Sequence, residues 1–196
     1  MERFGVVKFS INNIKLPFRR QEWAFILSIY LEAGDGPVTL ANAATTVTVN
    51  SNTLSVEGDI DEANAGSTLT KAGNGTLALN GAVRHTGGTT VSAGTLAIGG
   101  EPGNPLSVSV SDGATLRLDP FVRLHEKTAI DIGEGASVVL HNRAPQGIRS
   151  LVVNGVRQDP SGTYGAIGSG ATHELECFSG YGKLVFRHPP TVIMVR

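Results

Sequence analysis

The chain of 196 residues can hold one elongated or one large globular domain, and 40% of its residues are hydrophobic, enough for a sizeable core. Sixteen lysines and arginines stand against seventeen aspartates and glutamates, a formal net charge of -1. This balance argues against nucleic acid or an anionic membrane surface as the main partner, because both reward a basic patch. The single cysteine, Cys177, excludes an intrachain disulfide.

Residues 1–36 form an N-terminal apolar segment that ends in a turn-forming Gly-Asp-Gly-Pro cluster. A basic start precedes the apolar run Trp23–Leu31, which is too short to span a membrane as a helix. This order is typical of a secretory signal. The run also fits a helix that caps a solenoid, because four apolar residues share one helical face: Trp23, Ile26, Leu27 and Tyr30. A misassigned start codon is a third interpretation.

Residues 37–165 are a series of short alternating segments separated by Gly, Asn, Asp and Ser. The recurring unit is a small residue, then Thr or Ser, then two apolar residues one position apart. The first apolar positions of the copies are Leu54, Leu77, Leu96, Leu116, Val138 and Leu184. Their spacings are 23, 19, 20, 22 and 46 residues, the last being twice 23. A period of this length is one coil of a solenoid.

The alternation predicts strands, because successive side chains of a strand point to opposite faces. Leu77 and Leu79 should point inward, and Thr76 and Ala78 outward. Further strands with the same alternation lie between the marked ones: Val47/Val49, Val108/Val110, Ile130/Ile132 and Leu151/Val153. Each coil therefore carries two or three strands. We expect six glycines to supply positive-φ corners between them: Gly73, Gly75, Gly81, Gly87, Gly88 and Gly94.

These patterns predict an all-β parallel β-helix, or β-solenoid, with about 20–23 residues per coil. The solenoid repeats span residues 37–165, and residues 166–196 form a C-terminal closing segment and tail. A β-sandwich is the competing fold. It is less favoured because matching strands are a coil length apart, and turn dipeptides of the hairpin type occur only at Asn74-Gly75 and Asp112-Gly113.

Carboxylates are the candidate catalytic residues, because a glycosidase needs two of them about 5–10 Å apart. The candidates are Asp112, Asp119, Asp131 and Glu134. Asp112 is more simply a turn residue, and Asp131 points outward without a matching acid on the adjacent coils. Paired acids at the coil period are not expected. Phe121 stands alone as an aromatic between residues 37 and 163, which also weakens a sugar-stacking site.

The five histidines are scattered at His85, His125, His141, His173 and His188. No His-x-x-x-His or Cys-x-x-Cys spacing supports a zinc site. Residues 173–177 predict a half-buried strand with Glu174 and Glu176 on one face. A catalytic pair of His173 with Cys177 is disfavoured, because the ends of such a strand lie about 13 Å apart. We therefore assign no catalytic, cofactor-binding or metal-binding residue.

Residues 66–98 contain the best copy of the repeat. The characteristic elements are Leu69-Thr70-Lys71, Gly73, Gly75-Thr76-Leu77, Leu79, Gly81, Thr86-Gly87-Gly88-Thr89 and Gly94-Thr95-Leu96. This segment resembles the autotransporter-associated β-strand repeat, also called the passenger-associated transport repeat. The resemblance implies a right-handed parallel β-helix within a large bacterial secreted or cell-surface protein. It also implies an extracellular or cell-surface location, associated with the outer membrane.

The resemblance implies a structural or adhesive passenger segment, and the unpaired acids and the nearly aromatic-free middle region predict that it has no catalytic activity. The alternative is a carbohydrate-active β-helix, a lyase or hydrolase with an unrecognised site. Expected partners are host or cell-surface glycans or proteins, with self-association through open coil ends, and neither nucleic acid nor a cofactor is expected. Because little sequence follows Phe186, we expect an incomplete passenger, a truncated gene product or a protein exported by another route.

Overall fold

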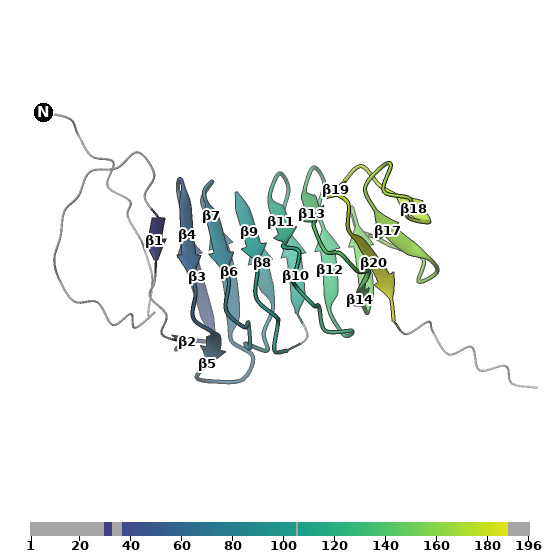
Figure 1. Ribbon diagram of the computed structural model, residues 1–196. Coiled ribbons are helices and arrows are strands. Elements are labelled where there is room, and N and C mark those ends of the chain that lie inside the picture. The colour runs from purple at the N-terminus through teal and green to yellow at the C-terminus, as the bar shows by residue number, and fades with distance from the viewer. Residues whose placement is uncertain (1–29, 33–36, 105, 188–196) are drawn as a thin grey trace, which may run out of the picture.

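The structure is a computed structural model that describes residues 30–32, 37–104 and 106–187 (Figure 1). All regular elements in these ranges are β-strands. Across the same ranges, no helix has the length and apolar character needed to cross a membrane. The predicted signal or cap within residues 1–36 lies outside the described residues, except for a short strand, β1 (Tyr30–Glu32).

Two long parallel sheets run the length of the molecule (Figure 1). The first sheet contains, in order, β1, β4 (Thr53–Val56), β7 (Thr76–Leu79), β9 (Thr95–Ile98), β11 (Thr115–Leu118), β13 (Ser137–Leu140) and β19 (Phe178–Gly180). Leu54, Leu77, Leu96, Leu116 and Val138 are successive partners in its register. Five of the six residues that mark the sequence period therefore stack directly on one another, as the coil interpretation predicts. The prediction is wrong for the sixth, Leu184, which lies in a separate four-stranded sheet, while Phe178 follows Val138 in this one.

The second sheet consists of β3 (Ala44–Thr48), β6 (Thr68–Ala72), β8 (Thr89–Val91), β10 (Ser107–Val110), β12 (Ala129–Ile132), β15 (Ser150–Val153) and the antiparallel β16 (Val156–Arg157). The chain passes from this sheet to the first through turns of 3 or 4 residues. It returns through connections of 11, 9, 8, 10 and 9 residues, which are 57–67, 80–88, 99–106, 119–128 and 141–149. The long connections form a third side of the solenoid.

Short strands line parts of this third side. β2 (Val38–Leu40) pairs with β5 (Ile60–Glu62), and Ile60 bridges to Val83 on the next coil. At the C-terminal end, a four-stranded sheet contains β14 (Gln146–Ile148), β20 (Lys183–Phe186), β17 (Thr163–Gly165) and β18 (His173–Glu174). The predicted two or three strands per coil are thus observed.

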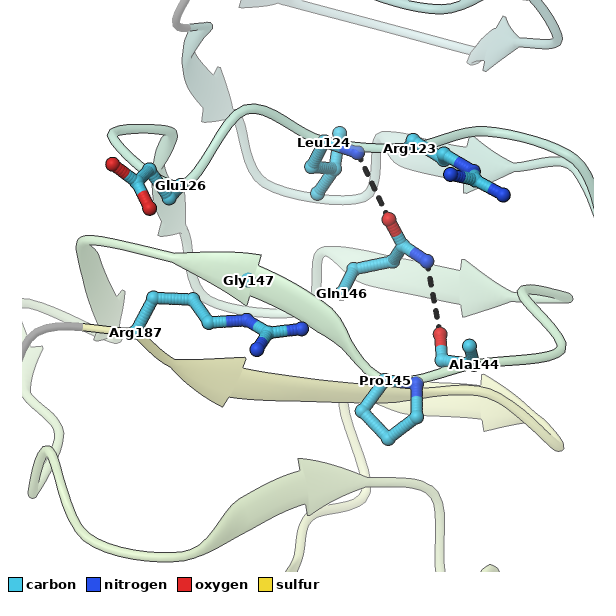
Figure 2. A pocket seen from close by; sticks show the side chains of 8 residues that line it. All are labelled: Arg123, Leu124, Glu126, Ala144, Pro145, Gln146, Gly147 and Arg187. Carbon is cyan, nitrogen blue, oxygen red and sulfur yellow. Dashed lines mark hydrogen bonds between the residues drawn. The ribbon is translucent and has the colours of Figure 1, made fainter.

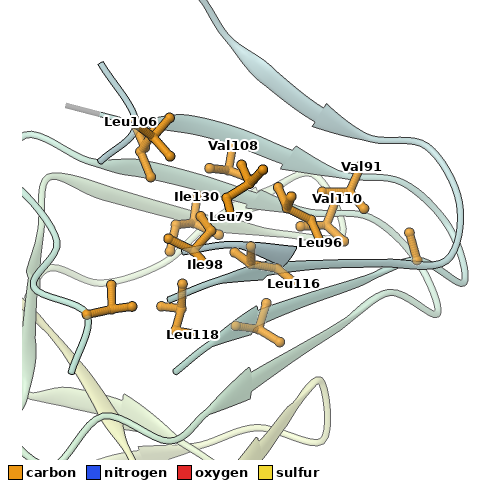
Figure 3. Close-up of a cluster of buried hydrophobic side chains, with 14 of the residues drawn as sticks. Leu79, Val91, Leu96, Ile98, Leu106, Val108, Val110, Leu116, Leu118 and Ile130 are labelled. Atoms are coloured by element: carbon orange, nitrogen blue, oxygen red, sulfur yellow. The ribbon is translucent and has the colours of Figure 1, made fainter. Parts of the chain in front are cut away.

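The core is a continuous apolar column between the two long sheets (Figure 3). Leu77, Leu96 and Leu116 are at most 1% exposed, whereas their neighbours Thr76, Thr95 and Thr115 are partly exposed. The inward direction of the leucines follows from the pleat, which turns every second side chain inward. The outward Ser55, Ala78 and Ala97 are also buried, so burial itself does not alternate throughout β4, β7 and β9. Because a single coil leaves its apolar face open, burial of these leucines depends on the coils above and below.

The expected role of the glycines is correct at two of six positions. Gly73 and Gly94 have φ of 78° and 63°. Gly75, Gly81, Gly87 and Gly88 do not have positive φ, so that prediction is wrong for them. A β-carbon at Gly81 would lie 2.3 Å from the carbonyl oxygen of Gly58 on the preceding coil. Glycine is needed there because backbones of stacked coils approach closely.

Aromatic side chains close the C-terminal end of the solenoid. Phe178 of β19 is the register partner of Val138 and is 4% exposed. Tyr164 is buried, its ring packs against Phe186 in an edge arrangement, and its hydroxyl donates to the Asp159 carbonyl at 2.8 Å. This end of the core is therefore covered by large apolar groups.

Candidate functional site

The candidate carboxylates are distributed over several coils. Asp131 points outward from β12, and its register partners are Ser109 and Val152, so it has no acidic neighbour on the adjacent coils. Asp119 forms an ion pair with Arg117 at 2.8 Å. Neither arrangement resembles the opposed acids of a glycosidase.

Asp112 and Glu134 do occupy equivalent positions on stacked coils. Each lies two residues beyond the aligned pair Val110 and Ile132, in turns of the same length. The expectation that no acids share the coil period is therefore wrong for this pair. The 22-residue interval was a usable signal in the sequence. Both side chains are exposed at the tips of turns.

The described histidines lie in separate environments. His141 stacks on Tyr181 with ring centroids 5.8 Å apart, and His173 stacks on Tyr164 at 4.5 Å. His188 lies outside the described residues. Within the described ranges, no group of three His, Cys, Asp or Glu side chains could hold a metal ion. Cys177 is half-buried, and burial raises the pKa of its thiol.

The 66–98 repeat buries a lysine inside the solenoid. Lys71 follows Val47 and precedes Val91 in an inward-facing column of the second sheet, and it is fully buried. Its Nζ donates to the carbonyls of Ala72, Gly73 and Ala93, at 3.0, 2.7 and 3.0 Å. Burial lowers the pKa of Lys71 to about 8. The ammonium group therefore ties the turn after β6 to the turn after β8.

A second polar network in this repeat surrounds His85, which is fully buried. Its Nδ1 lies 3.2 Å from the Ser67 carbonyl oxygen, so Nδ1 must carry the proton, because that oxygen can only accept. Nε2 then accepts from the Thr89 hydroxyl at 3.1 Å. Desolvation lowers the pKa of His85. In the neutral ring, both nitrogens therefore have a hydrogen-bond partner.

Glu62 joins this network from the preceding coil. Its carboxylate accepts the hydroxyl and the N–H of Thr86, at 2.6 and 3.0 Å, and the N–H of Ser67 at 3.0 Å. The Thr86 hydroxyl contributes most to lowering the pKa of Glu62. The conformation of the Thr-Gly-Gly-Thr segment is therefore fixed by hydrogen bonds between coils.

A cavity of about 380 Å³ opens on the third side of the solenoid (Figure 2). It lies between the connection 119–128 and the segment that leads into β14, with the end of β20 beside it. Its lining residues are Arg123, Leu124, Glu126, Ala144, Pro145, Gln146, Gly147 and Arg187. The volume falls in the range of small-ligand pockets.

Gln146 forms the centre of this cavity and is 7% exposed. Its side-chain oxygen accepts from the Leu124 N–H at 2.9 Å, and its side-chain nitrogen donates to the Ala144 carbonyl at 2.9 Å. Figure 2 shows both bonds, which clamp two stacked connections together. The wall of the cavity is thus held by an amide that is hydrogen-bonded through both its oxygen and its nitrogen.

Arg187 reaches the cavity across β14, beside Gly147. A β-carbon at Gly147 would lie 2.3 Å from Cγ of Arg187, so the missing side chain makes room for the arginine stem. Sequence reasoning missed this site, because Arg123, Gln146 and Arg187 belong to no motif. The one periodic signal is the interval of one coil between Arg123 and Gln146.

Comparison with protein families identifies the repeat. Residues 69–98, which run from β6 to β9, match the model of the passenger-associated-transport-repeat. The predicted resemblance to this repeat is confirmed. No curated protein and no solved structure matches the chain significantly. A passenger-associated repeat within a β-solenoid fits a segment of an autotransporter passenger.

Proposed function

We propose that this chain is a structural or adhesive segment of an autotransporter-like passenger, located at the bacterial surface or secreted, and without catalytic activity. The observation that carries the proposal is the continuity of the matched repeat with its neighbours. Strands β7 and β9 of the repeat pair in register with β4 before them and β11 after them. The whole solenoid therefore extends the repeat for which a passenger-associated family is defined.

The outer faces support a spacer or adhesive role. Thr46, Thr70, Thr90 and Ser109 stack along the second sheet, and Thr53, Thr76, Thr95 and Thr115 stack along the first. These hydroxyl columns are polar and uncharged. Because coils stack about 4.8 Å apart, the length of such a rod grows with each repeat. The proposed partners are cell-surface glycans or proteins, with self-association through coil ends.

Export can be tested by placing residues 37–187 between a secretory signal and an outer-membrane translocator domain in a Gram-negative host. We expect protease added to intact cells to remove the solenoid, as it would a surface passenger. A Leu96→Asp variant is the control for folding, because a buried carboxylate should prevent the coils from stacking and so should prevent a folded solenoid from forming. Retention of the unmodified solenoid inside the cell would refute the passenger assignment.

The stacked acids Asp112 and Glu134 are the one observation that favours the alternative, a carbohydrate-active β-helix. Incubation of the purified chain with pectin, alginate and xylan, followed by measurement of new reducing ends and unsaturated products, tests it. We expect no product. Product formation that disappears in Asp112→Asn and Glu134→Gln variants would replace the non-catalytic proposal with the enzymatic one.

A further inference from the structure

We propose that the cavity beside β14 binds an oxyanion, in particular the carboxylate of an acidic sugar unit, through Arg187, with Arg123 adding positive charge at the edge. Nothing in a spacer role requires such a site, so this inference goes beyond the proposed function. It depends on the direction of the Arg187 guanidinium into the cavity, on the way in which Arg187 is positioned, and on the surrounding charges.

The two arginines reach the cavity from distant parts of the chain. Arg123 comes from the connection after β11, and Arg187 follows β20. Figure 2 shows them on opposite sides of Gln146, with the guanidinium of Arg187 directed toward the centre. A guanidinium group is a fork of N–H donors that matches a carboxylate, sulfate or phosphate. Because the guanidinium of Arg123 is directed away from Arg187 in Figure 2, the anionic group would bind at Arg187, with Arg123 as a second positive charge at the edge of the cavity.

The position of Arg187 is determined by the backbone. Its N–H donates to the Ile148 carbonyl at 3.2 Å, which fixes the start of the side chain beside β14. Its stem occupies the space left by Gly147, where a β-carbon would lie 2.3 Å from Cγ and 2.9 Å from Nε. A positioned arginine loses less conformational entropy on binding than one free in solvent.

The carboxylates near the cavity leave the guanidinium groups accessible. Glu101 lies 3.7 Å from Nε of Arg123, but both side chains are largely exposed, at 68% and 83%, so the pair is weak. Among the described residues, Arg187 has no ion pair. Glu126 also lines the cavity, and Figure 2 shows its carboxylate directed away from Gln146.

An exposed aromatic ring lies close in the chain to residues that line the cavity. Phe121 is 74% exposed and lies two residues before Arg123. Arg143, adjacent to the lining residue Ala144, places its guanidinium carbon 5.4 Å from the centre of that ring. A cation over an aromatic face keeps a third positive charge beside the opening.

The proposal can be tested with the full chain and three probes at low ionic strength: sodium galacturonate, sodium sulfate and neutral galactose. Binding is measured by isothermal titration calorimetry and by chemical-shift changes of arginine side chains. We expect saturable binding of galacturonate or sulfate, no binding of galactose, and weaker binding at high salt. Tighter binding of galacturonate than of sulfate would identify a sugar contribution, whereas equal binding would identify a general oxyanion site.

Three variants distinguish this site from nonspecific attraction. Arg187→Gln should weaken anion binding about tenfold or more, the value of one charge-assisted contact. Gly147→Ala should also weaken binding with Arg187 intact, because its methyl group displaces the arginine stem. Arg157→Gln, at an exposed arginine of β16, is the matched control and should change affinity less than about twofold.

Thermal unfolding and circular dichroism of each variant check that the fold is retained. Equal binding of galactose, an equal loss in Arg157→Gln, or no saturable binding of either anion would overturn the proposal. None of these outcomes affects export of the solenoid, so failure of the binding site and failure of the proposed function can be distinguished.

Discussion

At the scale of single residues, the buried Lys71 should make the free energy of unfolding vary with pH in the alkaline range. The pKa of Lys71 is lowered to about 8 in the folded chain, from an ordinary value of 10.5. Between these values the unfolded chain binds more protons, so stability attributable to Lys71 rises with pH, by at most about 1.4 kcal/mol per unit. We expect the free energy of unfolding of the native chain to rise from pH 7.5 to 9.5 relative to that of Lys71→Met.

The comparison with Lys71→Met removes contributions from other groups. Burial raises the pKa of the Cys177 thiol, so the stability attributable to Cys177 falls as pH rises over much of the same range. This change is the same in both proteins. Urea unfolding at four pH values provides the measurement. Parallel curves for the two proteins would show that the ammonium group is not desolvated in the folded chain.

His85 should make the free energy of unfolding decrease as pH falls into the mildly acidic range. Its pKa lies below 6.5 in the folded chain, so the unfolded chain takes up the proton first as pH falls. Stability should therefore decrease below about pH 6.5, by at most about 1.4 kcal/mol per unit. A proton on Nε2 would also break its bond from Thr89. Urea unfolding at pH 7.5 and 5.0 should show a smaller decrease for His85→Gln than for a His125→Gln control.

At the scale of elements, close stacking of coils predicts unequal effects of added methyl groups. A β-carbon at Gly100 would lie 2.1 Å from the Gly81 carbonyl oxygen, whereas one at Gly88 would have no neighbour closer than 3.8 Å. Gly100→Ala should cost about 2–3 kcal/mol, because a backbone atom must move. Gly88→Ala should change stability by about 0.5 kcal/mol or less. Equal urea midpoints for the two variants would contradict the observed stacking.

The sequence predicted strands and coils well, because inward leucines recur at a period that stacking requires. It predicted the glycines poorly. A glycine at positive φ and a glycine beneath a neighbouring carbonyl look alike in one sequence, as Gly73 and Gly81 illustrate. The repeat motif includes Lys71, but the inward direction of its side chain depends on the strand phase, which places it between Val47 and Val91.

At the scale of the whole molecule, the closing segment should prevent self-association through the C-terminal coil end. Phe178, Leu184 and Phe186 cover strands that would otherwise end the sheets. A chain ending at Val153 loses this cover and exposes apolar side chains and unpaired strand edges. We expect concentration-dependent oligomers by light scattering, and fewer of them in a chain ending at Arg187. A monomeric shorter chain would show that the cap is dispensable.

The cavity could not be predicted from the sequence, because its parts meet only after the coils have stacked. Arg123 and Gln146 lie one coil apart. Arg187 follows β20, far along the chain, and lies beside β14 because β20 pairs with β14. Periodicity describes the coils, whereas the pairing of β14 with β20 breaks the simple repeat. The site therefore forms where the regular pattern ends.

The unequal connections on the third side have a consequence for how this scaffold can diversify. They vary from 8 to 11 residues, yet the strands before and after them keep an unbroken register. Extra residues are accommodated outside the ladder and leave the stacked leucines in place. Insertions in the exposed parts of these connections can therefore introduce new surface chemistry, whereas the core residues that the connections contribute, such as Ile60, Val83 and Val122, must be kept.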